Sequence, residues 1–110
     1  GIAVSSGNSF VHETESQVIL NGSYNINFTM DLVLKDTGLF DELAKKLKAP
    51  LEISPKVVEI FKDGQKKYGS RAWSSMIVKR MEDLNNVDFR ADGFPEELVD
   101  NEIEENGYEI

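Results

Sequence analysis

The sequence contains no cysteine, and it has three prolines, one histidine and one tryptophan among its 110 residues. Without cysteine, a disulfide framework, a thiolate metal site and a thiol nucleophile are all excluded, and a cytoplasmic protein is the natural expectation. Apolar runs are only a few residues long, so we expect no membrane span, and the first residues lack the pattern of a signal peptide. The one histidine, His12, is expected on the surface rather than in a catalytic or metal site.

Acidic residues are concentrated near the end of the chain. The net charge is -8, but from Glu82 onward eleven acidic residues face Arg90 alone, a net of -10, which leaves +2 for the rest. This balance disfavours nucleic acid and anionic membranes as partners. Residues 87–110 form either an extended acidic strap, whose apolar residues dock into surface grooves, or a disordered acidic tail.

The remaining sequence shows helical patterns and no convincing strand pattern. Capping residues, turns and apolar periodicity predict four helices: Ser9 toward Leu20, Asn27 to Lys48, Ser54 to Tyr68, and one capped by Ser70. In the last helix Trp73, Ile77, Met81 and Leu84 form the expected core stripe. Gly64 lies on the inner face of the third, where it would let a neighbouring helix approach closely. The expected fold is therefore all-α, a compact bundle of about four helices over residues 1–86 with an extended acidic C-terminal tail over 87–110.

One carboxylate interrupts the apolar side of the long helix. At about 100° per residue, Asp36 lies among the side chains that form the apolar stripe, which are Phe28, Leu32, Leu39, Leu43 and Leu47, with Val33 and Phe40 beside them. Lys35 lies at the edge of the same stripe. Burying an unpartnered charge is costly, so a donor in this chain, or a donor, substrate or cofactor brought by another domain, must meet Asp36.

Other patterns that carry chemistry are missing. No G-x-G-x-x-G loop follows a strand, so the chain alone is not expected to bind a dinucleotide pyrophosphate. No serine lies in a nucleophile elbow, and the acids Asp92, Glu96, Glu97 and Asp100 lack the spacing of a calcium loop. We therefore assign no catalytic residue and no metal site to this chain.

Several short motifs, taken in order, resemble a known family. Phe28 precedes the pair Lys35-Asp36 by seven residues, and the helix ends shortly before Pro50. Upstream lies Ser6-Gly7-Asn8-Ser9-Phe10, and downstream Tyr68-Gly69 closes the next helix. This arrangement over roughly residues 5 to 85 resembles the C-terminal helical domain of the beta-hydroxyacid dehydrogenases, which include 3-hydroxyisobutyrate dehydrogenase and are related to 6-phosphogluconate dehydrogenase.

The resemblance implies an enzyme of two domains with different roles. It implies an NAD(P)-dependent oxidoreductase acting on a small beta-hydroxy acid or related semialdehyde, with NAD or NADP bound by an N-terminal Rossmann domain that is absent from this chain. The catalytic lysine would also lie outside it, so this part is expected to bind no cofactor and to be inactive alone. Lys35 resembles the lysine that approaches the nicotinamide end of the cofactor, and Phe28 and Asp36 resemble residues that line the same cleft.

The sequence departs from the family pattern at one place, and it also allows a second functional interpretation. Many members carry an acidic residue early in the last helix, where this chain has Ala72 and Trp73, so the choice of hydroxy acid stays open. The family's helical domains commonly form a subunit interface, which implies a homodimer or tetramer. The alternative is a non-catalytic helical dimerisation or interaction module, in which Asp36 is satisfied within the chain, for example by Arg71 or Arg80.

Overall fold

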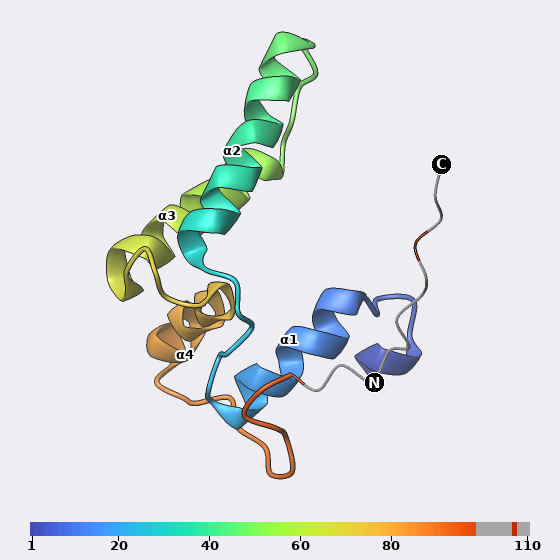
Figure 1. The fold of residues 1–110 in the computed structure, drawn as a ribbon, viewed down its shortest axis with the longest axis vertical. Coiled ribbons are helices and arrows are strands. Elements are labelled where there is room, and N and C mark those ends of the chain that lie inside the picture. Colours follow the sequence, from blue (N-terminus) through green and yellow to red (C-terminus); the bar gives the residue numbers. More distant parts are fainter. Residues whose placement is uncertain (99–106, 108–110) are drawn as a thin grey trace.

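The computed structural model describes residues 1–98 and 107 (Figure 1). The elements in chain order are η1 (Ile2–Val4), α1 (Phe10–Asn21), α2 (Met30–Lys46), α3 (Ser54–Tyr68), η2 (Ser74–Val78) and α4 (Lys79–Asn85), where η marks a 3-10 helix. Extended pairing among these residues is limited to one isolated bridge between Thr29 and Trp73. The expected all-α class with four α-helices is confirmed.

The first helix forms as expected from its terminal residues. The side chain of Ser9 accepts a hydrogen bond from the backbone N–H of His12 at 3.0 Å, which satisfies one donor at the helix start. At the other end Gly22 adopts a left-handed conformation with φ 90°, which is accessible to glycine without a Cβ clash. These two residues explain why a weakly amphipathic segment still has sharp ends.

The second helix begins two residues later than expected from a cap at Asn27. Its N-cap is Thr29 rather than Asn27, because Asn27 has φ 55° and cannot continue into the helix. The start of α2 instead pairs with the loop before η2. The backbone N–H of Met30 donates to the carbonyl of Ala72 at 2.9 Å. These bonds fix the position at which α2 starts.

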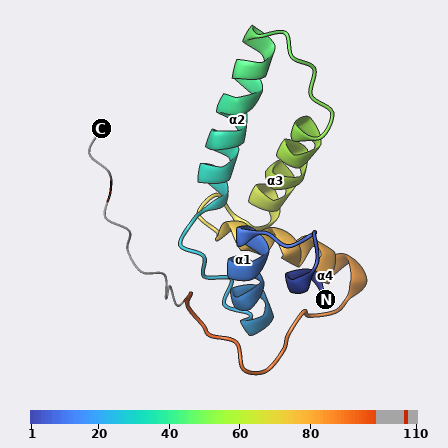
Figure 2. The same cartoon turned by 90° about the vertical axis from the view of Figure 1, so that its right-hand side faces the viewer.

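Helices α2 and α3 lie side by side as a hairpin that projects from the rest of the molecule (Figure 2). Ser54 was expected to cap α3, but Ile53 holds the N-cap position and the Ser54 hydroxyl donates to Asp41 of α2 at 2.6 Å. Helix α3 otherwise has the expected range, and Gly69 follows its last residue. The Ser54 hydroxyl therefore joins the two helices instead of capping one.

The side of α2 that faces α3 is not the expected leucine stripe. Asp41, Met30 and Ala44 share the side that meets α3, and the last two are buried. Leu39, Leu43 and Leu47 are 59, 54 and 70% exposed. The expectation that this stripe is packed is therefore wrong for this chain, because α3 covers one side of α2 and meets it through the small Ala44 and the Asp41 contact.

Gly64 on α3 allows the close approach that was expected of it. A Cβ built at this position would lie 2.7 Å from Cδ1 of Ile77 and 3.2 Å from Sδ of Met30. Gly64 is buried, and its missing side chain makes room for η2 and for the start of α2. This prediction is confirmed.

The segment after α3 differs most from its sequence prediction. Ser70 does not start a helix; the chain forms the 3-10 helix η2 from Ser74 and turns into α4 only at Lys79. Of the expected core stripe, Met81 is 48% and Leu84 is 69% exposed. The expectation fails because backbone groups of residues 70–74 bond to the start of α2, which keeps this stretch out of a helix.

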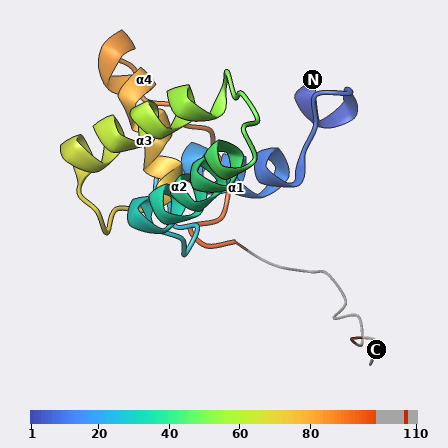
Figure 3. The ribbon, with the colours of Figure 1, turned by 90° about the horizontal axis from the view of Figure 1, so that it is seen from above.

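Residues 87–98, here called the strap, run back past the end of α1 (Figures 1 and 3). Among the hydrogen bonds that fasten the strap are Ala91 N–H to Leu20 O at 3.0 Å, Asn21 Nδ2 to Phe94 O at 3.0 Å, and Ser23 Oγ to Glu96 O at 2.6 Å. Its apolar side chains stay partly exposed, with Phe89 at 40% and Phe94 at 36%. Polar contacts rather than apolar docking therefore hold this segment, and residues 99–106 and 108–110 of the expected tail lie outside the described residues.

Candidate functional site

Lys35 and Asp36 form an ion pair on the outer side of α2. The Nζ of Lys35 lies 3.2 Å from Oδ1 of Asp36, and the two side chains are 61 and 58% exposed. The donor that Asp36 required is therefore its own neighbour, whereas Arg71 pairs with Asp31 and Arg80 with Asp63. The expectation of a carboxylate on a packed surface is corrected: in this chain the pair meets water, and its structural stabilisation is small.

Phe28 precedes α2 and is held by its backbone. Its carbonyl accepts a hydrogen bond from the N–H of Ser74 at 2.8 Å, while its side chain is 37% exposed. The ring is thus available on the surface at a position fixed by the loop before η2. Phe28 and Lys35 are carried by one continuous segment, the end of the α1–α2 linker and the second turn of α2.

The first turn of α2 is anchored by Asp31. Its carboxylate accepts from Thr29, from the N–H of Leu32 at 3.0 Å and from Arg71 at 3.2 Å. The hydrogen bond from Thr29, followed by the one from Arg71, lowers the pKa of Asp31 from its usual value. A carboxylate here also suits the positive end of the helix dipole. These hydrogen bonds therefore fix the first turn of α2, which precedes the turn that carries Lys35.

The Lys35–Asp36 pair shares its side of α2 with uncovered apolar side chains. At about 100° per residue, Asp36 falls between Leu43 and Leu47 around the helix, with Leu39 nearby. All three leucines are more than half exposed. A charged pair surrounded by exposed leucines has the composition of a surface that another domain or subunit covers.

A second polar cluster, made of Tyr24, Glu82 and Arg90, was not found from the sequence. Glu82 is 1% exposed; it accepts from Tyr24 Oη at 2.5 Å, from Arg90 Nη1 at 2.9 Å and from the N–H of Phe89 at 3.1 Å. Burial alone raises the pKa of Glu82, but the hydrogen bonds from Tyr24, Phe89 and Arg90 outweigh burial and lower it. The cluster therefore holds a buried carboxylate in its charged form.

This cluster supports the segment that carries Phe28. The carbonyl of Tyr24 accepts from the Ser75 hydroxyl at 2.6 Å, and both groups are buried. Tyr24 has φ 55°, a conformation unusual for a bulky residue, so the contacts on both its backbone and its hydroxyl are needed to hold it. The one sequence signal was Arg90, the single base among the acids that begin at Glu82.

A family model described as NAD-binding of NADP-dependent 3-hydroxyisobutyrate dehydrogenase matches residues 1–81. The chain belongs to this family. Membership of the NADP-dependent 3-hydroxyisobutyrate dehydrogenase family agrees with the resemblance seen in the Phe28 and Lys35-Asp36 motif. The match ends just before Glu82, so the carboxylate of the buried cluster and the strap lie beyond it. No curated protein and no solved structure matches the chain.

Two features are absent from the described residues of this dehydrogenase-family domain. Within residues 1–98 and 107, no group of three acidic or histidine side chains is placed to hold a metal ion. In the same range, no helix combines the length and the apolar character that crossing a bilayer requires.

Proposed function

We propose that this domain closes over the nicotinamide end of NAD or NADP in a dehydrogenase acting on a small beta-hydroxy acid or related semialdehyde. The family match over residues 1–81 supports a dehydrogenase domain. The observation that carries the location is the exposed Lys35–Asp36 pair among uncovered leucines on α2. In the proposed enzyme this surface faces a cleft shared with a nucleotide-binding domain, and the cleft residues are Phe28, Lys35 and Asp36.

The side chains suit this role chemically. Lys35 supplies a positive charge and three N–H donors, which can stabilise a ribose or substrate oxygen on which negative charge develops. Asp36, at 3.2 Å, orients the ammonium group before ligand binds. Phe28 excludes water from the path of hydride transfer once the cleft closes. None of these groups replaces the acid–base catalyst, which we place outside this chain.

The proposal assigns the dinucleotide to a partner domain. This chain has no G-x-G-x-x-G loop, so the pyrophosphate would be bound by an N-terminal Rossmann domain. We expect the separate domain to be inactive and to bind neither NAD nor NADP. Calorimetric binding of either cofactor to the 110-residue chain with a Kd below about 1 mM, about -4 kcal/mol, would contradict this assignment.

The test uses the full-length enzyme carrying Lys35→Ala. Loss of the ammonium group should lower nicotinamide-dependent kcat/KM at least about tenfold, about 1.4 kcal/mol of transition-state stabilisation. Lys45→Ala, near the other end of the same helix, is the matched control and should leave turnover unchanged. Because Lys35 is 61% exposed, the fold should survive its replacement. Unchanged kinetics in Lys35→Ala would exclude the assigned role.

The alternative is a non-catalytic dimerisation module, and the exposed leucines favour it directly. Leu43→Asp would place a charge on this surface, so a dimer formed through it should dissociate in analytical ultracentrifugation. Dimerisation alone does not separate the two proposals, since an oxidoreductase can also associate through this surface. A dimer abolished by Leu43→Asp, together with full activity in Lys35→Ala, would favour the interaction module.

A further inference from the structure

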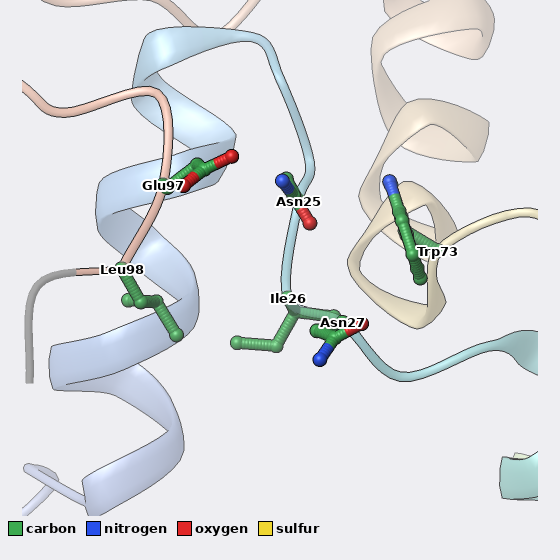
Figure 4. Close-up of a pocket in the computed structure, with 6 residues that line it drawn as sticks. All are labelled: Asn25, Ile26, Asn27, Trp73, Glu97 and Leu98. Atoms are coloured by element: carbon green, nitrogen blue, oxygen red, sulfur yellow. The ribbon is translucent and has the colours of Figure 1, made fainter.

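A cavity of about 470 Å³ lies between the α1–α2 linker, Trp73 and the end of the strap (Figure 4). Its lining residues are Asn25, Ile26, Asn27, Trp73, Glu97 and Leu98. They come from three separate parts of the chain. The strap supplies one wall, and neither Phe28 nor the Lys35–Asp36 pair belongs to the lining. The lining residues are therefore different from those of the proposed dehydrogenase cleft, which begins beside them at Phe28.

The charges around the cavity select a cation. Glu97 is the one ionisable side chain among the lining residues, and no basic side chain is among them. Figure 4 shows its carboxylate pointing toward Asn25. Glu96, the neighbour of Glu97 in the strap, adds a charge of the same sign. A phosphate or carboxylate ligand would be repelled here, whereas a cation would be attracted.

The remaining lining residues indicate which kind of cation would fit the cavity. The carboxylate of Glu97 and the amide oxygens of Asn25 and Asn27 are the hydrogen-bond acceptors that the lining side chains offer to a primary ammonium group. The indole of Trp73 can attract the same charge through its face. Ile26 and Leu98, which point toward each other in Figure 4, offer apolar surface for a short alkyl chain. We propose that this cavity binds a primary alkylammonium, the protonated form of a small free amine.

Hydrogen bonds hold the backbone of the strap just before Glu97. The preceding carbonyl, that of Glu96, accepts from the Ser23 hydroxyl at 2.6 Å, and the carbonyl of Phe94 accepts from Asn21 at 3.0 Å. Ser23 also accepts from the N–H of Asn25 at 3.2 Å, so one hydroxyl joins two walls of the cavity. The backbone that carries Asn25 and the backbone before Glu97 are therefore held in place before the ammonium enters, which favours binding.

Trp73 provides the readout because it is the only tryptophan in the sequence. Its fluorescence should change saturably when the 110-residue chain is titrated with n-butylammonium at neutral pH. The neutral analogue 1-butanol should bind at least about tenfold more weakly. Equal binding of 1-butanol would overturn the proposal, because the cavity would then recognise only the alkyl chain.

Glu97→Gln and Glu96→Gln form a matched pair for this titration. Both remove one negative charge from exposed neighbouring side chains, so neither should disturb the fold. The proposal predicts that Glu97→Gln weakens n-butylammonium binding at least about tenfold and that Glu96→Gln weakens it less than about twofold. Equal losses in both variants would mean unspecific attraction by the acidic chain and would overturn the site.

A lysine side chain carries the same ammonium group and needs a separate arm of the experiment. Nα-acetyl-lysine methylamide should bind no more tightly than n-butylammonium if the site takes a free amine. Binding more than about tenfold tighter would overturn the free-amine assignment, because contacts to the peptide groups would then supply the extra affinity.

Discussion

Arg90 donates from Nη1 to Oε1 of Glu82 across 2.9 Å, and Glu82 is 1% exposed. The same guanidinium donates from Nη2 to the Tyr24 hydroxyl at 2.9 Å and lies 5.3 Å above the centre of that ring. Gly22 leaves the space for it, because a Cβ there would lie 2.5 Å from Nε. One arginine thus links α1, α4 and the strap.

Glu82→Gln should destabilise the fold. The substitution keeps the shape of the side chain but removes the charge that accepts bonds from Tyr24, Arg90 and the Phe89 amide. Because the Arg90 side chain is 36% exposed and can be rehydrated, we expect a loss of about 2 kcal/mol in the free energy of unfolding. Urea denaturation measures this loss. Glu96→Gln is the control and should change stability by less than about 0.5 kcal/mol; equal effects would contradict a specific role for Glu82.

Stability should fall in acid. The pKa values of Glu82, Asp31, Asp63 and Asp83 are lowered in the folded state, while burial raises that of Glu15. A carboxyl with a lowered pKa stabilises the fold above its unfolded pKa, and this contribution disappears as the pH falls through the folded value. The four lowered groups outnumber Glu15, so the free energy of unfolding should decrease below about pH 4.5. A smaller decrease in Glu82→Gln would assign part of it to that residue; no decrease in the wild type would contradict the cluster.

Tyr68 should ionise at a higher pH than an ordinary tyrosine. Burial, followed by its 2.6 Å hydrogen bond to Asp83, raises the pKa of Tyr68 to about 12. The folded state therefore favours the neutral phenol, and the stability it contributes is complete below about pH 10 and is lost as the pH rises toward 12. Because burial also raises the pKa of Tyr24, phenolate absorbance should show a late step to which both tyrosines contribute, and Tyr68→Phe should reduce its amplitude. An unchanged amplitude of the late step in Tyr68→Phe would contradict the Tyr68–Asp83 contact.

Two helical glycines should respond differently to larger side chains. No atom lies within 4 Å of a Cβ built at Gly38, so Gly38→Ala should raise the free energy of unfolding by about 1 kcal/mol through helix propensity. At Gly64 the added atoms would meet Ile77 and Met30, and Gly64→Val should cost about 2 kcal/mol by overpacking. Thermal or urea unfolding measures both. A neutral Gly64→Val would contradict the close packing of α3 against η2.

Local signals in the sequence were sufficient for α1 and α3. The capping hydroxyl of Ser9 sets the start of α1, and Gly22 and Gly69 follow the ends of α1 and α3. Gly64 was correctly identified as a point of close approach because its face could be read from helical periodicity. These features depend on interactions within one helix or on one side of it, which a sequence displays.

Long-range backbone pairing was not visible in the sequence. The start of α2 and the late start of α4 both depend on bonds between residues 28–31 and 70–74, which no local pattern specifies. Glu82 looked like a surface acid because its partners, Tyr24 and Arg90, are 58 and 8 residues away.

The side of α2 that faces α3 could not be chosen from amphipathicity alone. The most apolar stripe of α2, which contains Leu39 and Leu43, is exposed in this chain and does not face α3. The motif of Phe28, Lys35 and Asp36 could be read from the sequence, but its role depends on a domain that the proposal places elsewhere.

The most direct test of the central claim is the chemical reactivity of Lys35 in the full-length enzyme with and without nicotinamide cofactor. Lysine acetylation followed by mass spectrometry would compare Lys35, whose side chain is 61% exposed in this domain, with the exposed Lys45 on the same helix. The account predicts that saturating cofactor slows modification of Lys35 at least about tenfold and leaves Lys45 unchanged. Equal reactivity of Lys35 with and without cofactor would contradict its place at the nicotinamide.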